Sequence, residues 1–463
     1  MRAPLVLILL TCLAAPAVAQ VGYPVKIVEA GVGLPPGRFG DGRDAATQRA
    51  LPLVKRGRWA PLALRLEMQK EIATGADVRV EAVDGDGLRT TLVTPLAASL
   101  AGQLPGAMLG PQDFAATPYV RSGDANGSVT VTLVSNDGKG RVLAEPYRTP
   151  YLQTPEAGSY VVFSIGSRLP GFALPDESRG ATGGGRGALR GGRVETAAAA
   201  TVTELPDQWV GYDAADLVVI PTGATSPQFL AELFGQNAGA AQLARRAALL
   251  EWVRRGGKLL VSVGANAGAV AQLPALQAIL PRPVALDPPS RAVEEVSFDV
   301  NAGGARITER LRSRADPAPP FPLANLAAAP GTRPARTLIP ARADADSGPP
   351  VVVQSNYGLG RVTLVAFDLD TSPFLDFPSR PQVWDYLLRE AGAPRSPRPG
   401  RGPRRFRPTP RTSGSGRSVT RSTPSRASRS SPSAGSRCSS PSTRSSSARS
   451  NTWYSSTSSA DSN

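Results

Sequence analysis

The chain has 463 residues, a formal net charge of +15 and no histidine. The absence of histidine excludes Ser-His-Asp and Cys-His catalysis within this chain, and every metal site that needs imidazole. From Arg395 to the end the sequence holds 14 arginines, no lysine and one acid, so this stretch carries +13 of the net charge. The remainder is nearly neutral, which does not favour nucleic acid as a partner of the folded part.

Residues 1–19 have the pattern of a secretory signal peptide. Arg2 precedes an apolar run from Leu5 to Leu13, and Ala17-Val18-Ala19 supplies the small residues of a cleavage site. The run is shorter than the roughly 20 apolar residues of a transmembrane helix. We therefore expect an exported protein of the periplasm or cell envelope. Its one remaining cysteine, Cys438, would leave no intramolecular disulfide.

Residues 20–157 have the pattern of an antiparallel β-sandwich. The segment 78–83 alternates apolar with mostly charged side chains before an Asp-Gly turn at 84–87. A second pair of short strands with a glycine-containing turn lies within 129–144. Short alternating strands joined by such turns are typical of a sandwich, and we expect Trp59 to be one of its core residues.

Residues 158–393 change to α/β patterning. The segments 161–165 and 217–220 are short apolar runs typical of buried parallel strands, and we expect a mobile glycine-rich loop at 173–193 between them. The clearest unit is 245–268, in which a helix, a glycine pair, an apolar strand and a small-residue turn follow one another. A β-α-β unit of this kind is right-handed.

The helix of this unit is expected to bury one face and to expose its charged residues, Arg245 among them. The residues predicted on the buried face are Leu243, Ala247, Leu250 and Val253. Gly256-Gly257 is expected to end the helix, 259–263 to form a central strand, and 269–280 to form a further helix.

Two more elements complete the domain. The runs 351–355 and 362–367 flank a turn and predict a hairpin at the sheet edge. Ser379 begins a last helix, with Pro381 in its first turn, that ends near Gly392. The sequence therefore predicts an α+β multidomain protein, with an N-terminal antiparallel β-sandwich followed by a three-layer α/β domain of flavodoxin-like type.

Residues 394–463 consist mostly of Arg, Ser, Pro, Thr and Gly, a composition that predicts a disordered tail because it cannot bury enough apolar surface. Three interpretations are open. The tail is a basic arm that binds an anionic polymer, a lipid or nucleic acid. Alternatively, it is an inert linker to a missing part. Finally, it is a frameshift product, because arginine, serine and proline codons dominate the shifted frames of a GC-rich gene.

The pattern Leu249-Leu250-x-Trp252-Val253-x-x-Gly256-Gly257-Lys258-Leu259-Leu260 resembles the class I glutamine amidotransferase-like superfamily. The resemblance covers residues 160–393 and implies the amidotransferase-like form of the three-layer α/β fold. In active members the strand runs into a G-x-C-x-G elbow that exposes the nucleophile. Here Gly264-Ala265-Asn266-Ala267-Gly268 has that spacing, with Asn266 in the place of the cysteine. The resemblance therefore implies a degenerate, non-catalytic domain.

The whole chain is also similar to a group of bacterial predicted membrane proteins of unknown function. These proteins place an exported β-sandwich before such a domain and anchoring transmembrane helices after it. The resemblance implies membrane association if the true C-terminus carries such helices. A frameshift after Pro394 would explain why this sequence does not show them.

Six residues are expected to line a residual cleft, because open α/β sheets bind ligands at the carboxyl ends of their strands. They are Gly223, Gly264, Asn266, Gly268, Asp368 and Asp370. We also expect Asp213 or Asp216 to approach the acid pair from a neighbouring strand. Paired carboxylates bind a metal or act as acid and base, whereas single acids at such places more often cap loops and helices.

These observations predict an exported, non-catalytic binding or scaffolding protein of the bacterial cell envelope, a pseudoenzyme with no catalytic residue, metal or cofactor. Its partner would be an envelope protein or a ligand that the sequence does not identify. One alternative is a carboxylate- or metal-dependent hydrolase that uses Asp368 and Asp370. The other is a binder of anionic polymer or nucleic acid that acts through the basic tail.

Overall fold

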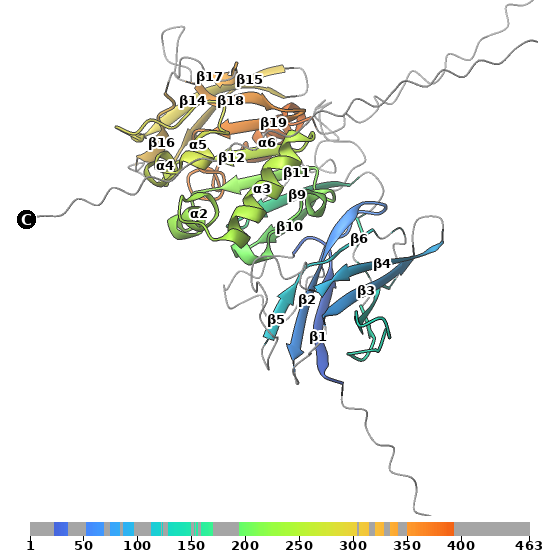
Figure 1. The fold of residues 1–463 in the computed structure, drawn as a ribbon. Coiled ribbons are helices and arrows are strands. Elements are labelled where there is room, and N and C mark those ends of the chain that lie inside the picture. The colour runs from blue at the N-terminus through green and yellow to red at the C-terminus, as the bar shows by residue number, and fades with distance from the viewer. Residues whose placement is uncertain are drawn as a thin grey trace, which may run out of the picture. The chain divides into compact units, whose positions relative to one another are not determined.

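The computed structural model describes residues 23–35, 52–68, 75–83, 87–96, 113–121, 123, 128–149, 152, 154–155, 159–169, 194–302, 305–313, 320–327, 334–340 and 350–392 (Figure 1). All of them belong to one compact unit of the chain. The predicted signal peptide, the glycine-rich loop at 173–193 and the arginine-rich tail lie outside the described residues. Within the described ranges, no helix is both long enough and apolar enough to cross a membrane.

The N-terminal part contains two four-stranded antiparallel sheets. In the first sheet the central strand β2 (Trp59–Met68) pairs with β1 (Val25–Val32), β5 (Asp113–Ala116) and β6 (Tyr119–Arg121). In the second sheet the strands lie in the order β4 (Arg89–Pro95), β3 (Ala76–Val83), β7 (Thr130–Ser135) and β8 (Tyr147–Arg148).

Alternation of side chains explains how these strands pack. In β3, Val78 and Val80 are buried and their neighbours are partly or fully exposed, as the period of two of a strand requires. Buried residues of both sheets belong to one hydrophobic core, so the sheets share an interior. The predicted antiparallel strands are therefore present. The prediction for Trp59 is wrong, because it begins β2 at the end of the sheet and is only half-buried.

The C-terminal part contains a mixed sheet with the strand order β10-β9-β11-β12-β19-β18-β17. The first five strands are parallel, and they are β10 (Val194–Ala199), β9 (Tyr160–Ile165), β11 (Leu217–Pro221), β12 (Lys258–Ser262) and β19 (Gly360–Val365). The last two are antiparallel to their neighbours, and they are β18 (Pro350–Tyr357) and β17 (Arg336–Pro340). The predicted hairpin is β18–β19, but it is not at the edge of the sheet because β17 pairs outside it.

Helices α2 (Pro227–Phe234) and α3 (Ala240–Arg254) connect β11 to β12, and α6 (Arg380–Glu390) follows β19. Helix α2 begins where Ser226 accepts a hydrogen bond from a backbone N–H of the first turn. Gly256 follows α3 with a φ of +121°, a conformation that glycine adopts most easily. The predicted end of this helix is therefore confirmed, as is the last helix after Ser379.

The predicted buried face of α3 is correct for Val253 but not for Leu243, Ala247 and Leu250. The helix buries the face formed by Arg245, Ala248, Leu249, Trp252 and Val253. Leu243 is 40% exposed, Ala247 is exposed and Leu250 is only half-buried. The face is rotated because Arg245 finds acceptors inside the protein, donating to Leu205 O at 3.1 Å and to Thr203 O at 3.4 Å.

The single helix predicted over 269–280 is also wrong. The structure has two short helices in its place, α4 (Ala267–Ala271) and α5 (Pro274–Gln277). Proline has no N–H to continue a preceding helix and is tolerated in a first turn. Pro274 therefore ends the first helix and begins the second.

The remaining elements are short. The 3-10 helices η2 (Val202–Glu204) and η3 (Trp209–Tyr212) lie between β10 and β11. Two antiparallel strand pairs lie between α5 and β17, and they are β13 (Ser290–Val293) with β16 (Phe321–Ala324) and β14 (Glu295–Ala302) with β15 (Ala305–Arg312). Buried residues of the mixed sheet and its helices form a second hydrophobic core.

Candidate functional site

The loops that follow β11, β12 and β19 meet at one edge of the mixed sheet, because these strands are parallel neighbours. Four predicted cleft residues come together there, namely Gly223, Gly264, Asp368 and Asp370. A β-carbon at Gly223 would lie 2.6 Å from Asp370 Oδ1 and 2.7 Å from Asp368 Cγ, and one at Gly264 would lie 2.5 Å from Asp368 Oδ2. The carboxyl groups thus pack directly against the backbone of two glycines, where a β-carbon would displace them.

Asp368 is 8% exposed and holds the loop after β12. Its Oδ2 accepts the N–H of Ala265 at 2.7 Å. Its Oδ1 is buried and has no hydrogen-bond partner among the described residues. Burial raises the pKa of Asp368 to about 6, and the charge of Asp370 adds to the rise, while the N–H groups of Ala265 and Gly264 oppose it.

Asp370 is 4% exposed and holds two further loops. Its Oδ2 accepts the N–H of Ala224 at 2.9 Å and the hydroxyl of Ser167 at 2.7 Å. Its Oδ1 is likewise buried without a partner in the described part of the chain. Ser167 was not among the predicted site residues. In the sequence, only its position just after the apolar run of β9 indicates that it lies at the same edge of the mixed sheet.

Asn266 lies beside this pair and ties two loops together. Its side-chain amide donates to Thr222 O at 2.5 Å and to Thr225 O at 2.9 Å. Gly268 lies within α4, and the nearest atom to a β-carbon there would be Pro289 Cγ at 3.8 Å. Asn266 is therefore bonded into the site, whereas Gly268 makes no close contact with the carboxyl pair.

A small pocket adjoins Asp368. Besides this carboxyl group and Ser372, it is lined by apolar side chains, which belong to Leu311, Phe321, Pro322, Phe367 and Pro373. Across the described ranges, no group of three or more histidine, cysteine, aspartate or glutamate side chains is placed to hold a metal ion. The chemistry that this arrangement offers directly is the uptake and release of a proton.

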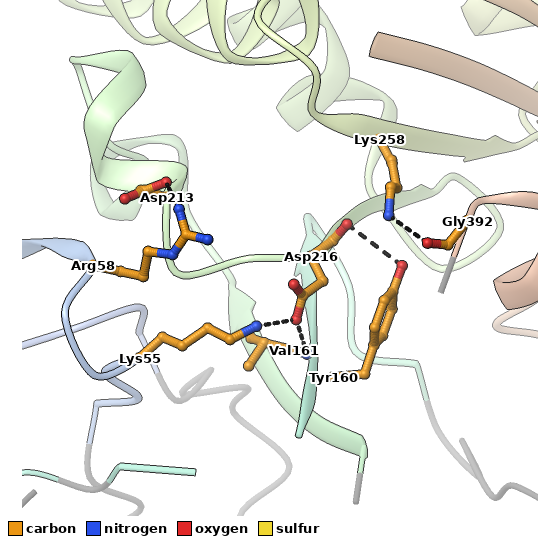
Figure 2. Close-up of polar contacts among 8 residues, drawn as sticks. All are labelled: Lys55, Arg58, Tyr160, Val161, Asp213, Asp216, Lys258 and Gly392. Atoms are coloured by element: carbon orange, nitrogen blue, oxygen red, sulfur yellow. Dashed lines mark hydrogen bonds and ion pairs between the residues drawn. The ribbon is translucent and has the colours of Figure 1, made fainter. Parts of the chain in front are cut away.

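A second polar cluster lies at the opposite, amino-terminal edge of the mixed sheet (Figure 2). Asp216 directly precedes β11, accepts the N–H of Val161 at 2.8 Å and pairs with Lys55 at 2.5 Å. Asp213 pairs with Arg58 at 3.2 Å. The expectation that either acid approaches Asp368 is wrong, because both precede β11 whereas Asp368 follows the parallel strand β19.

Lys258, the first residue of β12, belongs to this second cluster (Figure 2). Its ammonium group donates to Gly392 O at 2.9 Å and lies 5.8 Å from the centre of the Tyr160 ring. Burial lowers the pKa of Lys258, Asp216 opposes this change, and neighbouring cations add to it. The contact with Gly392 fixes the chain just beyond α6 at this edge of the sheet.

No family model and no curated protein matches the chain. Similar solved structures include a β-galactosidase from Bacillus circulans sp. alkalophilus, with a TM-score of 0.26 and 14% identity over 43% of this chain and 25% of the enzyme. Another is a β-galactosidase from Rahnella sp. R3, with a TM-score of 0.26 and 16% identity over 46% of this chain and 26% of the enzyme. The chain thus spans about a quarter of the length of these enzymes. TM-scores this low support no inference about its fold or function.

Proposed function

We propose that this protein is an exported, non-catalytic binding or scaffolding protein of the bacterial cell envelope. In this proposal residues 158–393 form a three-layer α/β domain of the amidotransferase-like type whose cleft has lost its catalytic groups. The signal-like sequence at residues 1–19 supports export, and the absence of histidine supports the loss of catalysis.

The observation that carries the proposal is the bonding of Asn266. In a catalytic elbow, the side chain at this position must be free to attack a substrate, and nearby backbone N–H groups must be free to bind its oxyanion. The amide of Asn266 instead donates to two carbonyl oxygens of the loop after β11. The N–H of the following residue, Ala267, which would be the oxyanion donor, instead donates to Gly264 O at 3.1 Å. The chain's own groups thus saturate the positions that would act on a substrate.

Loss of catalysis is tested by measuring ammonia release from glutamine with the purified wild-type chain. We expect no turnover above that of buffer, and Asn266→Cys should not restore it because no histidine is present to activate the thiol. Turnover by the wild type that Asn266→Ala abolishes would contradict the proposal.

Export and binding are tested separately. Mass spectrometry of protein recovered from the envelope should find a mature chain that begins at Gln20, and a chain that retains residues 1–19 would contradict export. For binding, a photoreactive residue at Gly268, beside the cleft, should crosslink to an envelope component in cells. The same group at Leu359, which is 85% exposed in the β18–β19 turn, is the control. Equal labelling from both positions would contradict a role for the cleft.

One observation favours a second function. The pKa of Asp368, about 6, is in the range of a general acid or base, and each carboxyl group of the pair has an oxygen without a partner among the described residues. A carboxylate-dependent hydrolase would lose its activity in Asp368→Asn and Asp370→Asn alike. Binding of an envelope component that is indifferent to both substitutions would favour the non-catalytic function.

A further inference from the structure

Asp368 and Asp370 form a buried pair of like charges. Both carboxyl groups flank the same point, since a β-carbon at Gly223 would lie 2.7 Å from one and 2.6 Å from the other. Neither forms an ion pair with a lysine or arginine among the described residues. Two ionised carboxylates that are this close and this buried repel each other and lack the hydration that would offset the cost.

The hydrogen bonding of the pair shows what would relieve this cost. Each carboxyl group uses its Oδ2 to hold loops and leaves its Oδ1 buried without a partner in the described structure. A single proton on Asp368 removes one of the two charges and with it the repulsion. A metal ion fits less well, because no third acid, histidine or cysteine of the described residues joins the pair.

We propose that a proton on Asp368, beside the buried Asp370, operates a pH-dependent clamp on the loops around the candidate cleft. The clamped loops are those after β9, β11 and β12, which are held through Ser167, Ala224 and Ala265. With the proton in place, the repulsion is absent and the loops are held together. When the proton leaves to solvent water, the two charges repel and the loops separate.

The groups that face the pair are neutral, so protonation of the pair decides whether the clamp is closed. The loops after β9, β11 and β12 contribute a hydroxyl group and backbone N–H groups, and the adjacent pocket contributes apolar side chains and Ser372. The charge that acts on Asp368 is that of Asp370. Because the pKa of Asp368 is raised to about 6, the clamp is closed at mildly acidic pH and opens toward neutral and alkaline pH. This holds whether or not the cleft is catalytic.

The test is hydrogen exchange of the full chain, followed by mass spectrometry at about pH 5 and about pH 7.5 and corrected for the intrinsic pH dependence of exchange. Peptides that contain Ala224 and Ala265 should lose protection roughly tenfold at the higher pH, since one pKa unit corresponds to a tenfold change. A peptide from β3 should keep its protection at both values, which excludes global unfolding.

Variants separate the proton from other causes. Asp368→Asn keeps an acceptor for Ala265 and removes the charge beside Asp370, so it should keep the loops protected at both pH values. Asp370→Asn should do the same if the first variant does not fold. Asp137→Asn, at a partly buried acid in the turn after β7, should leave the wild-type pH response unchanged.

Three results would overturn the proposal. The first is equal protection of the wild-type loops at both pH values. The second is loss of protection at both pH values in both asparagine variants. The third is recovery of protection at about pH 7.5 on addition of Ca²⁺ or Mg²⁺, because a metal ion would then hold the pair.

Discussion

Replacing Asp368 with asparagine should change how the stability of the protein depends on pH. The pKa of Asp368 is raised from an ordinary value of 3.8 to about 6. Between these values the folded protein binds more protons than the unfolded chain, so the free energy of unfolding falls as pH rises. A rise of about two pKa units corresponds to about 3 kcal/mol, because each unit is worth about 1.4 kcal/mol. This stability is fully present below about pH 4 and is lost as pH rises through about 6.

The assay is urea denaturation of the wild type and of Asp368→Asn at several pH values between about 4 and 7.5. The difference between the two proteins at each pH cancels the titration of carboxyl groups that do not interact with Asp368. We expect this difference to shift in favour of the variant by about 3 kcal/mol across the range, because asparagine does not ionise. Asp137→Asn is the control, since the pKa of Asp137 is lowered to about 2 by Ser135 and Arg141 and stays outside the window. A constant difference, or one that favours the wild type as pH rises, would refute the argument.

Two other substitutions test the packing of the cleft and the contact between the N-terminal and C-terminal parts of the chain. Gly264→Ala should cost about 1–3 kcal/mol of unfolding free energy in urea, because its β-carbon would press on Asp368, as overpacking does. Gly268→Ala, four residues on, should be neutral or slightly stabilising, and an equal loss in both variants would show that the carboxyl contact is not the cause. Tyr119→Phe should cost about 1–3 kcal/mol in thermal unfolding, because the hydroxyl donates to Asp207 and accepts two backbone N–H groups. Unchanged stability would mean that water replaces these bonds.

The parallel strands could be predicted from the sequence because burial leaves a direct mark on composition. β9 and β11 are buried at every position, and β12 at every position after Lys258. A strand surrounded by other elements needs apolar side chains on both faces, so its sequence reads as a continuous apolar run. The antiparallel strands left an equally direct mark in their alternation.

Periodicity failed where a polar residue is buried with its own partners. Arg245 reads as a surface residue, yet its guanidinium donates to two carbonyl oxygens beside η2. Those acceptors lie some 40 positions earlier in the chain, and no local pattern indicates them. The opposite failure is Leu243, which is apolar and 40% exposed, as single surface leucines often are.

The sequence predicts the candidate site only to the extent that it predicts the order of the strands. Asp368 and Gly264 could be brought together because parallel neighbours end at one edge of a sheet. Asp216 was placed at the wrong edge of the sheet, because it precedes its strand. Its partner Lys55 comes from the N-terminal part of the chain. Ser167 was missed because serine is common after strands, and only the three-dimensional contact with Asp370 distinguishes this one.

The contact between Lys258 and Gly392 has a practical consequence for handling the protein. Gly392 is held at the amino-terminal edge of the mixed sheet, whereas Asp368 and its pocket lie at the carboxyl-terminal edge. A tag, a fluorophore or a linker to a sensor surface joined directly after this residue would start from the side away from the carboxyl pair. Immobilised in that way, the molecules would present the pocket to solution in a uniform orientation.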